Sequence, residues 1–331
     1  MAQMSENSNS NMSDRSEPPA DNNKENSKEE RKKLKILALH GYRQNGALFR
    51  GKIGSFRKAV SKYAQLTFIS APHRVMNEEG GGDEVPLEKL LSTDLVLTDS
   101  NPPAKENNWW DSECEEASEK RKTAKREYCA KKTKESLDAY RKLAAVSKRT
   151  ILRKKGADAR SWWFNAEDNT FSGKCLGGPA IGFEDTLRLI ERTVAEHGPF
   201  DGLMGFSQGA CLAGLLAAMQ QKGYLPYTFK FVIFTSGFRS GSLVHKGFYD
   251  EEIDLPSLHV YGESDSIIPK EMSESLISLF VKPVVVEHSG GHYVACSGSI
   301  RDSYQDFLHD RCQDLNEEDQ ESKEDSDRRN S

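Results

Sequence analysis

The chain has 331 residues, a formal net charge of −5 at pH 7 and six cysteines. So small a net charge does not mark a nucleic-acid-binding protein, and cysteines without a C-x-x-C pair predict neither a disulfide framework nor a zinc site. No run of about 18 apolar residues occurs, and the chain begins without an apolar signal core, so we expect a cytoplasmic protein with no membrane span.

The two ends of the chain are poor in apolar residues. Residues 1–30 are rich in Ser, Asn, Glu, Asp and Lys, and residues 311–331 are mostly charged. Such segments bury too little apolar surface to offset the entropy that is lost on ordering. We therefore expect a disordered tail at 1–30 and a disordered acidic tail at 311–331, on either side of one domain at 31–310.

Between these ends, short apolar runs alternate with stretches of helical spacing. Strands are predicted at 34–39, 66–70, 229–234, 257–261 and 283–287, with another leading into Gly205. Helices are predicted at 183–197, at 210–219, after Pro269 and at 298–309. The alternation predicts an α/β fold, a doubly wound, mostly parallel sheet with helices on both faces, in which ligands bind beyond the carboxyl ends of the strands.

A basic insert interrupts this pattern at about 99–160. From Asp111 to Lys155 it holds 15 Lys or Arg and 8 Asp or Glu, a charge of about +7 by subtraction, with only a thin apolar stripe. We expect a solvated helical hairpin or a partly disordered segment rather than a second core. The insert is either a solvated spacer, which its interleaved acids favour, or a basic arm that binds nucleic acid or an acidic partner.

The stretch Gly205-Phe206-Ser207-Gln208-Gly209 matches G-x-S-x-G and lies between a predicted strand and a helix of small residues. In that context the motif is a nucleophile elbow, a strained turn that exposes the serine hydroxyl. The pattern alone arises by chance in roughly one chain in ten at ordinary Gly and Ser frequencies. Ser207 is therefore a candidate nucleophile only if a base and an acid accompany it.

Two residues that could supply this base and acid, Asp265 and His292, each follow a predicted strand. The chain order Ser, Asp, His is that of α/β hydrolases, and the strand-end loops of a parallel sheet open at one edge. His292 is the expected base, and Asp265 is expected to orient its imidazole. The alternatives that we consider weaker are His288 for the base, and Asp254 and Glu263 for the acid.

Acyl transfer also needs N–H donors for the developing oxyanion. One candidate is the backbone N–H of Gln208 at the start of the helix, and the other is the N–H of Tyr42 in the loop after the first strand. His40 in the same loop is expected to organise it. The sequence has no phosphate loop, dinucleotide fingerprint or metal-ligand cluster, so we expect neither cofactor nor metal.

Trp162, Trp163 and Phe164 are adjacent aromatic residues outside an obvious strand. They either form a wall over an apolar substrate or fill a seam of the core, and the sequence does not separate these interpretations. The first interpretation makes them candidate substrate contacts and favours a long acyl chain.

With these residues identified, the chain resembles the small serine hydrolases of the α/β-hydrolase group. That group includes the fungal family-of-serine-hydrolases proteins, the LovG thioesterase and the animal esterase of ovarian-cancer-associated gene 2. The resemblance covers nearly all of 34–98 and 161–310, without a counterpart for the basic insert. It rests on His40–Asn45, Ala71–His73, Trp162–Phe164, Gly198–Gly202, Gly205–Gly209, Thr235–Phe238 and Ser289–His292.

The resemblance implies a serine carboxylic ester hydrolase that acts on alkyl or long-chain acyl esters, with its triad on Ser207, Asp265 and His292. Two alternatives stay open. An acyl-thioesterase would use the same residues, and a non-catalytic scaffold would use the basic insert to bind a protein partner.

Overall fold

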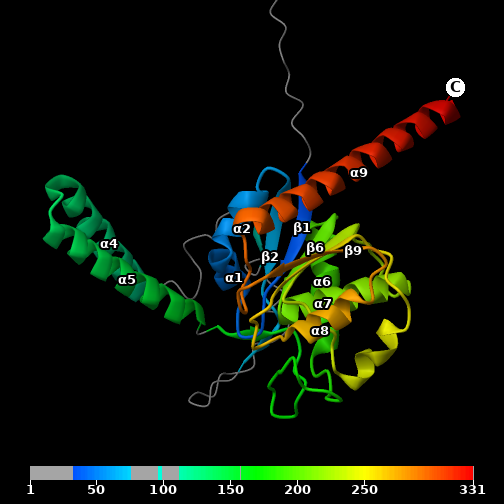
Figure 1. Cartoon of the computed structure of the whole chain (residues 1–331), viewed down its shortest axis with the longest axis horizontal. Helices are drawn as coiled ribbons and strands as arrows, with labels where there is room; N and C mark the ends of the chain where they lie inside the picture. The colour runs from blue at the N-terminus through cyan, green and yellow to red at the C-terminus, as the bar shows by residue number, and fades with distance from the viewer. Residues whose placement is uncertain (1–32, 76–95, 99–111, 157, 331) are drawn as a thin grey trace, which may run out of the picture. The chain divides into compact units, whose positions relative to one another are not determined.

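A computed structural model describes residues 33–75, 96–98, 112–156 and 158–330, so the tail expected at 1–30 lies outside the described residues. Within them, a seven-stranded sheet has the order β4-β2-β1-β6-β7-β8-β9 (Figure 1). Its strands are β1 (Leu34–Leu39), β2 (Ala64–Ile69), β4 (Val96–Thr98), β6 (Gly202–Phe206), β7 (Phe231–Thr235), β8 (Ser257–Gly262) and β9 (Pro283–His288).

The sheet is parallel except at one edge, where β4 pairs antiparallel with β2. The predicted α/β fold is confirmed, and the predicted strands agree with the observed ones to within two residues. Strand β4 was not predicted, because three residues give no periodic signal. The chain goes from β1 outward to β2 and later returns to the other side of β1 as β6, so the strand order reverses between β1 and β6. In open α/β sheets this switch point is where ligands bind.

Helices cover both faces of the sheet because successive strand residues point to opposite sides. In β1, Leu37 and Leu39 belong to one buried cluster, whereas Ile36 and Ala38 belong to another. The first cluster includes residues of α6 (Phe183–His197), α7 (Gln208–Gln221) and α8 (Lys270–Ile277). The second includes residues of α1 (Gly46–Lys52), α2 (Gly54–Val60) and the start of α9 (Gly298–Asn330).

The described part of the basic insert is a helical hairpin made of α4 (Ser112–Lys131) and α5 (Lys134–Gly156) (Figure 1). The two helices pack against each other, with a parallel stack of Tyr128 on Tyr140 whose ring centroids are 6.4 Å apart. Most of the described side chains are exposed, and Glu116 and Lys120 form an ion pair one turn apart. This agrees with the expected solvated hairpin.

The C-terminal helix α9 differs from the sequence prediction. The helix was expected to end at His309 and a disordered tail to begin at 311, but α9 continues to Asn330. Cys312 and Leu315 pack against the core cluster on that face of the sheet, and Arg311 pairs with Asp314 at 2.9 Å. These contacts dock the helix onto the core as far as Leu315, because a few apolar residues on one face suffice to hold a turn that is otherwise charged.

Candidate active site

Ser207 lies in the tight turn between β6 and α7. Its φ of 54° is a strained value for a residue with a side chain, as expected of a nucleophile elbow. The glycines on either side permit the close approach. A Cβ at Gly209 would lie 2.2 Å from the carbonyl oxygen of Leu39, and one at Gly205 would lie 2.4 Å from the Cα of Ala210. The turn therefore requires glycine at both positions.

The structure brings His292 and Asp265 to this serine. The Nε2 atom of His292 lies 3.0 Å from Ser207 Oγ, and its Nδ1 lies 2.7 Å from Asp265 Oδ2. All three residues follow the carboxyl ends of parallel strands, β6, β8 and β9. The arrangement forms a continuous hydrogen-bonded path from hydroxyl to imidazole to carboxylate.

Asp265 is held as an anion by its surroundings. Its other oxygen, Oδ1, accepts hydrogen bonds from the N–H groups of Ile267 and Ile268 at 3.0 and 2.9 Å. Burial alone raises the pKa of this carboxyl, but the Ile268 N–H and the contact with His292 outweigh it and bring the pKa below its ordinary value. A buried carboxylate of this kind favours a proton on the facing Nδ1 atom.

The weaker alternatives lie elsewhere. His288 accepts a hydrogen bond from the N–H of Gly290 and faces Tyr293, and Glu263 is exposed. Asp254 precedes β8, at the amino end of the strand, and Asp201 accepts from the N–H of Lys35 at the amino end of β1. Among the described residues, none of these three alternatives forms a hydrogen bond with Ser207 or His292, and neither does Asp201.

The loop after β1 lies over the serine. A Cβ at Gly41 would be 3.3 Å from the Cβ of Ser207, and Tyr42 lines the same pocket as the serine. Within the described residues, neither the N–H of Tyr42 nor that of Gln208 has a hydrogen-bond acceptor. The Gln208 N–H is the first of α7, where a helix leaves its amides unpaired.

His40 holds this loop in place. Its Nδ1 donates to the carbonyl oxygen of Gly41 at 2.8 Å, and its Nε2 accepts from the N–H of Ala71 at 2.9 Å. Burial lowers the pKa of His40 to about 4, so the ring is neutral at pH 7, as this donor–acceptor pattern requires. The carbonyl of His40 accepts from the indole Nε1 of Trp162 at 2.7 Å.

The three adjacent aromatic residues lie in the core. Trp162 and Trp163 are fully buried, and neither they nor Phe164 line the pocket at Ser207. Phe164 packs against Val75 and Ala159. The sequence left two interpretations of these residues open. In the structure the three side chains fill the core, and residues 162–164 do not form a wall that could bind a long acyl chain.

The pocket at Ser207 has a volume of about 240 Å³. Its apolar wall comes from segments that carried no signal in the sequence, chiefly Phe171 and Ile268, together with Phe238 of the Thr235–Phe238 motif. Lys174 stands at the rim and donates to the carbonyl oxygen of Ser266 at 3.0 Å. The pocket is lined by Tyr42, Phe171, Ser172, Gly173, Lys174, Ser207, Phe238, Ser266, Ile267 and Ile268.

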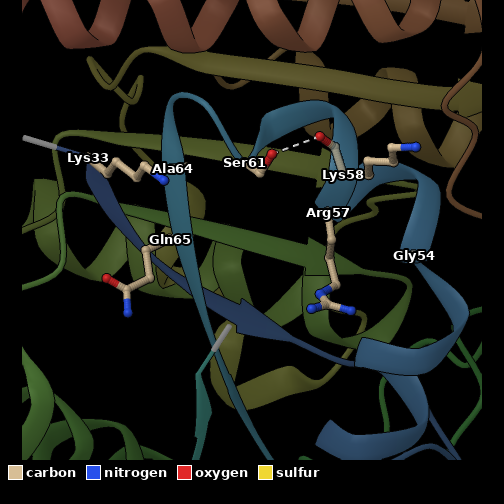
Figure 2. A pocket seen from close by; sticks show the side chains of 7 residues that line it. All are labelled: Lys33, Gly54, Arg57, Lys58, Ser61, Ala64 and Gln65. Atoms are coloured by element: carbon tan, nitrogen blue, oxygen red, sulfur yellow. Dashed lines mark hydrogen bonds between the residues drawn. The ribbon is translucent and has the colours of Figure 1, made fainter. Parts of the chain in front are cut away.

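A larger hollow of about 470 Å³ lies away from the serine (Figure 2). It is bordered by the residues that begin β1 and β2, whereas Ser207, Asp265 and His292 follow the opposite, carboxyl ends of their strands. It therefore takes no part in the site described above. The lining residues are Lys33, Gly54, Arg57, Lys58, Ser61, Ala64 and Gln65.

Arg160 is a positioning residue that the sequence did not reveal. It is buried, pairs with Asp158 at 2.9 Å and donates to the carbonyl oxygens of Ala71 and Pro72. Its backbone bonds to both Arg43 and Gln44 in the loop that carries Tyr42. A buried arginine inside a basic insert has no sequence signature that separates it from its solvated neighbours.

Comparison with known proteins identifies the family. A family model described as "Serine hydrolase (FSH1)" matches residues 29–147 and 130–304. The chain belongs to the FSH1 serine hydrolase family. The resemblance seen in the sequence is thereby confirmed.

Relatives of this family member carry esterase names. "Esterase AGAP003155" of Anopheles gambiae is 38% identical over 85% of this chain and 79% of its own length. "Esterase OVCA2" of Danio rerio is 33% identical over 83% of this chain and 96% of its own length. The crystal structure of Zea mays acyl-protein thioesterase 2 aligns over 85% of this chain and 94% of that chain, at 14% identity and a TM-score of 0.44.

No group of three or more His, Cys, Asp or Glu side chains in 33–75, 96–98, 112–156 and 158–330 is placed to hold a metal ion. In the same part of the chain, no helix is long and apolar enough to cross a membrane.

Proposed function

We propose that this member of the FSH1 family is a serine carboxylic ester hydrolase that works through Ser207, His292, Asp265 and a covalent acyl-enzyme. The observation that carries the proposal is the pair of distances from His292, 3.0 Å to Ser207 Oγ and 2.7 Å to Asp265 Oδ2. Both lie in the range for a nucleophile, its base and an orienting acid.

In the proposed mechanism, Ser207 Oγ attacks the ester carbonyl carbon while His292 Nε2 takes the hydroxyl proton. The N–H groups of Gln208 and Tyr42 donate to the oxyanion of the tetrahedral intermediate. His292 then gives the proton to the leaving alkoxide. Water, deprotonated by the same imidazole, attacks the acyl-enzyme and releases the carboxylic acid. Asp265 keeps the imidazole oriented and stabilises its protonated form throughout.

We propose alkyl or long-chain acyl esters as substrates, since Phe171, Phe238 and Ile268 give the pocket an apolar wall. A volume of about 240 Å³ holds only the first part of a long chain, because one water-sized group occupies about 30 Å³. The rest of such a chain has to lie outside the pocket. The thioesterase alternative uses the same residues, and the protein is proposed to act in the cytoplasm.

The test is labelling with a fluorophosphonate probe, which reacts with activated serines. We expect labelling of the full chain, its loss in Ser207→Ala, and a fall in kcat of about 10⁶-fold for that variant. Ser278→Ala, an exposed serine on another element, is the matched control and should label normally. Labelling that survives Ser207→Ala removes the serine from this role.

A second experiment separates ester from thioester hydrolysis. The values of kcat/KM are measured for oxygen and sulfur esters of the same acyl group, over a series of chain lengths. A higher value for the oxygen esters supports the proposal, and a higher value for the thioesters replaces it with the thioesterase.

A further inference from the structure

Two surface loops beside the pocket expose large aliphatic side chains. Leu176 is 85% exposed, Leu243 is 67% exposed and Val244 is 65% exposed. We call these three residues the rim patch. Isolated apolar residues on a surface are ordinary, but several together beside a ligand pocket mark an interaction site.

Hydrogen bonds join the two loops. The N–H of Gly177 donates to the carbonyl oxygen of Gly241 at 2.8 Å, and the N–H of Leu243 donates to that of Gly178 at 3.1 Å. A Cβ at Gly241 would lie 3.1 Å from Leu176 Cδ2. The three side chains of the rim patch therefore belong to one stretch of surface.

Both loops of the rim patch begin at residues that line the pocket containing Ser207. The first loop leaves the pocket wall at Phe171–Lys174, two residues before Leu176. The second leaves the same wall at Phe238, five residues before Leu243. Ile267, which also lines the pocket, is itself 56% exposed. The rim patch is therefore separated from the pocket wall by only a few residues of chain.

The charged residues of the two loops are basic. Residues 171–182 and 238–249 contain no Asp or Glu but contain Lys174, Arg239 and Lys246, in a chain whose net charge is −5. Acids follow each segment closely, Glu184 after the first and Asp250 after the second, and Asp250 Oδ2 lies 3.9 Å from the position of a Cβ at Gly247. Exposed aliphatic groups together with the cations of these loops match a partner that has an apolar interior and an anionic surface.

We propose that the rim patch docks the protein onto the surface of an anionic lipid bilayer. Leu176, Leu243 and Val244 enter the boundary between headgroups and acyl chains, and Lys246 contacts the phosphates. The attachment of both loops to the pocket wall favours a lipid over a protein partner, because a bilayer presents acyl chains beside a pocket with an apolar wall. The docking does not depend on the hydrolysis proposed above.

The test is co-sedimentation of the full chain with phosphatidylcholine vesicles, with and without phosphatidylserine. We expect binding to the anionic vesicles, a loss of at least tenfold in the triple variant Leu176→Ser, Leu243→Ser, Val244→Ser, and a loss of about fivefold in Lys246→Gln. The double variant Val146→Ser, Val285→Ser removes exposed apolar groups on the hairpin and on β9, outside both loops, and should bind as the wild type does.

The triple variant should keep its far-ultraviolet circular dichroism and its hydrolysis of a soluble short-chain ester, since its positions neither line the pocket nor touch the catalytic residues. Three results overturn the proposal. One is a wild type that does not sediment with anionic vesicles. Another is a triple variant that binds as well as the wild type, which assigns the binding to the basic hairpin. The last is a dimer in light scattering without lipid that the triple variant abolishes, which assigns the patch to a second copy.

Discussion

The side-chain amide of Gln208 donates to the carbonyl oxygen of Trp163 at 2.8 Å, across 45 residues of sequence. Its oxygen accepts from the N–H of Trp162 at 3.1 Å. The residue directly after Ser207 is thus bonded to the segment that also holds the loop of His40 and Tyr42. The side chain of Gln208 therefore links the start of α7 to the segment that holds the loop of Tyr42. These are the two parts of the chain whose N–H groups are proposed to bind the oxyanion.

Gln208→Leu should destabilise the protein and slow catalysis together. The change leaves the buried N–H of Trp162 unpaired, at a cost of about 1–3 kcal/mol in the free energy of unfolding, whereas the carbonyl of Trp163 keeps its hydrogen bond from Ser161 Oγ at 2.6 Å. Urea denaturation and the kcat for a soluble ester measure the two effects. Gln220→Leu is the matched control, because Gln220 makes the same pair of bonds to the backbone of Phe229, away from the site. It should lose stability and keep kcat, and an equal loss of kcat in both variants would count against the positioning role.

Trp162→Phe and Trp163→Phe should differ although both rings are fully buried. The indole N–H of Trp162 donates to the carbonyl of His40, whereas within the described residues that of Trp163 has no partner. Losing the first bond costs about 1–3 kcal/mol and loosens the loop of Tyr42, so kcat falls. Trp163→Phe should cost less and leave kcat nearly unchanged. Equal thermal shifts and equal kcat values in the two variants contradict this assignment.

Asp265→Asn should lower kcat by about 10⁴-fold, since an amide no longer fixes the imidazole in the required tautomer. The low pKa of Asp265 also has a pH signature. A carboxyl whose folded pKa is depressed stabilises the protein above its unfolded pKa of about 3.9, and this contribution is lost as pH falls through the folded pKa. The stability difference from Asp265→Asn should shrink in that acid range. Glu263→Gln, an exposed neighbour, is the control and should leave kcat unchanged.

Acid should destabilise the fold through its buried histidines well before the carboxylates titrate. Burial lowers the pKa to about 4 for His40 and His245 and to about 3 for His259. Between pH 6.5 and these values the unfolded chain binds protons that the folded chain does not, so stability falls by about 1.4 kcal/mol per pH unit for each group. In urea denaturation, His259→Phe should lose less stability than the wild type between pH 6.5 and pH 4. Parallel pH profiles refute this.

Gly209→Ala should abolish or severely impair folding, because its Cβ would lie 2.2 Å from a backbone oxygen of β1 that cannot move aside. Gly54→Ala is the control: within the described residues nothing lies within 4 Å of the added Cβ, and the position begins helix α2. The control should match or exceed the wild type in thermal stability. A soluble, fully active Gly209→Ala protein would show that strand and helix are less close at the elbow than described.

The sequence was sufficient to predict the sheet, the elbow and the positions of Ser207, Asp265 and His292, because each follows from a strong local pattern. Apolar runs predict buried strands, and polar residues next to glycine predict the loops that follow the strand ends. The pocket wall was not predicted, since Phe171 lies in an irregular loop without a periodic pattern, held by side-chain bonds between Asn165 and Ser172 and by the bond from Gly177 to Gly241. The burial of Trp162 and Trp163 was not predicted either, because their backbone is bonded to Gln208, 45 or more residues away in the sequence. Helix α9 was predicted too short because a charged composition outweighed its two apolar contacts at Cys312 and Leu315.

The two-residue ladder between β3 (His73–Arg74) and β5 (Arg160–Ser161) brings the chain on either side of the basic hairpin to one point. The same ladder adjoins the loop of Tyr42, because the backbone of Arg160 also bonds to Arg43 and Gln44. A substitution of Arg160 therefore acts directly on that loop, whereas α4 and α5 contribute no residue to the pocket at Ser207. A change in the length of the two helices should thus leave the loop of Tyr42 in place as long as the ladder forms.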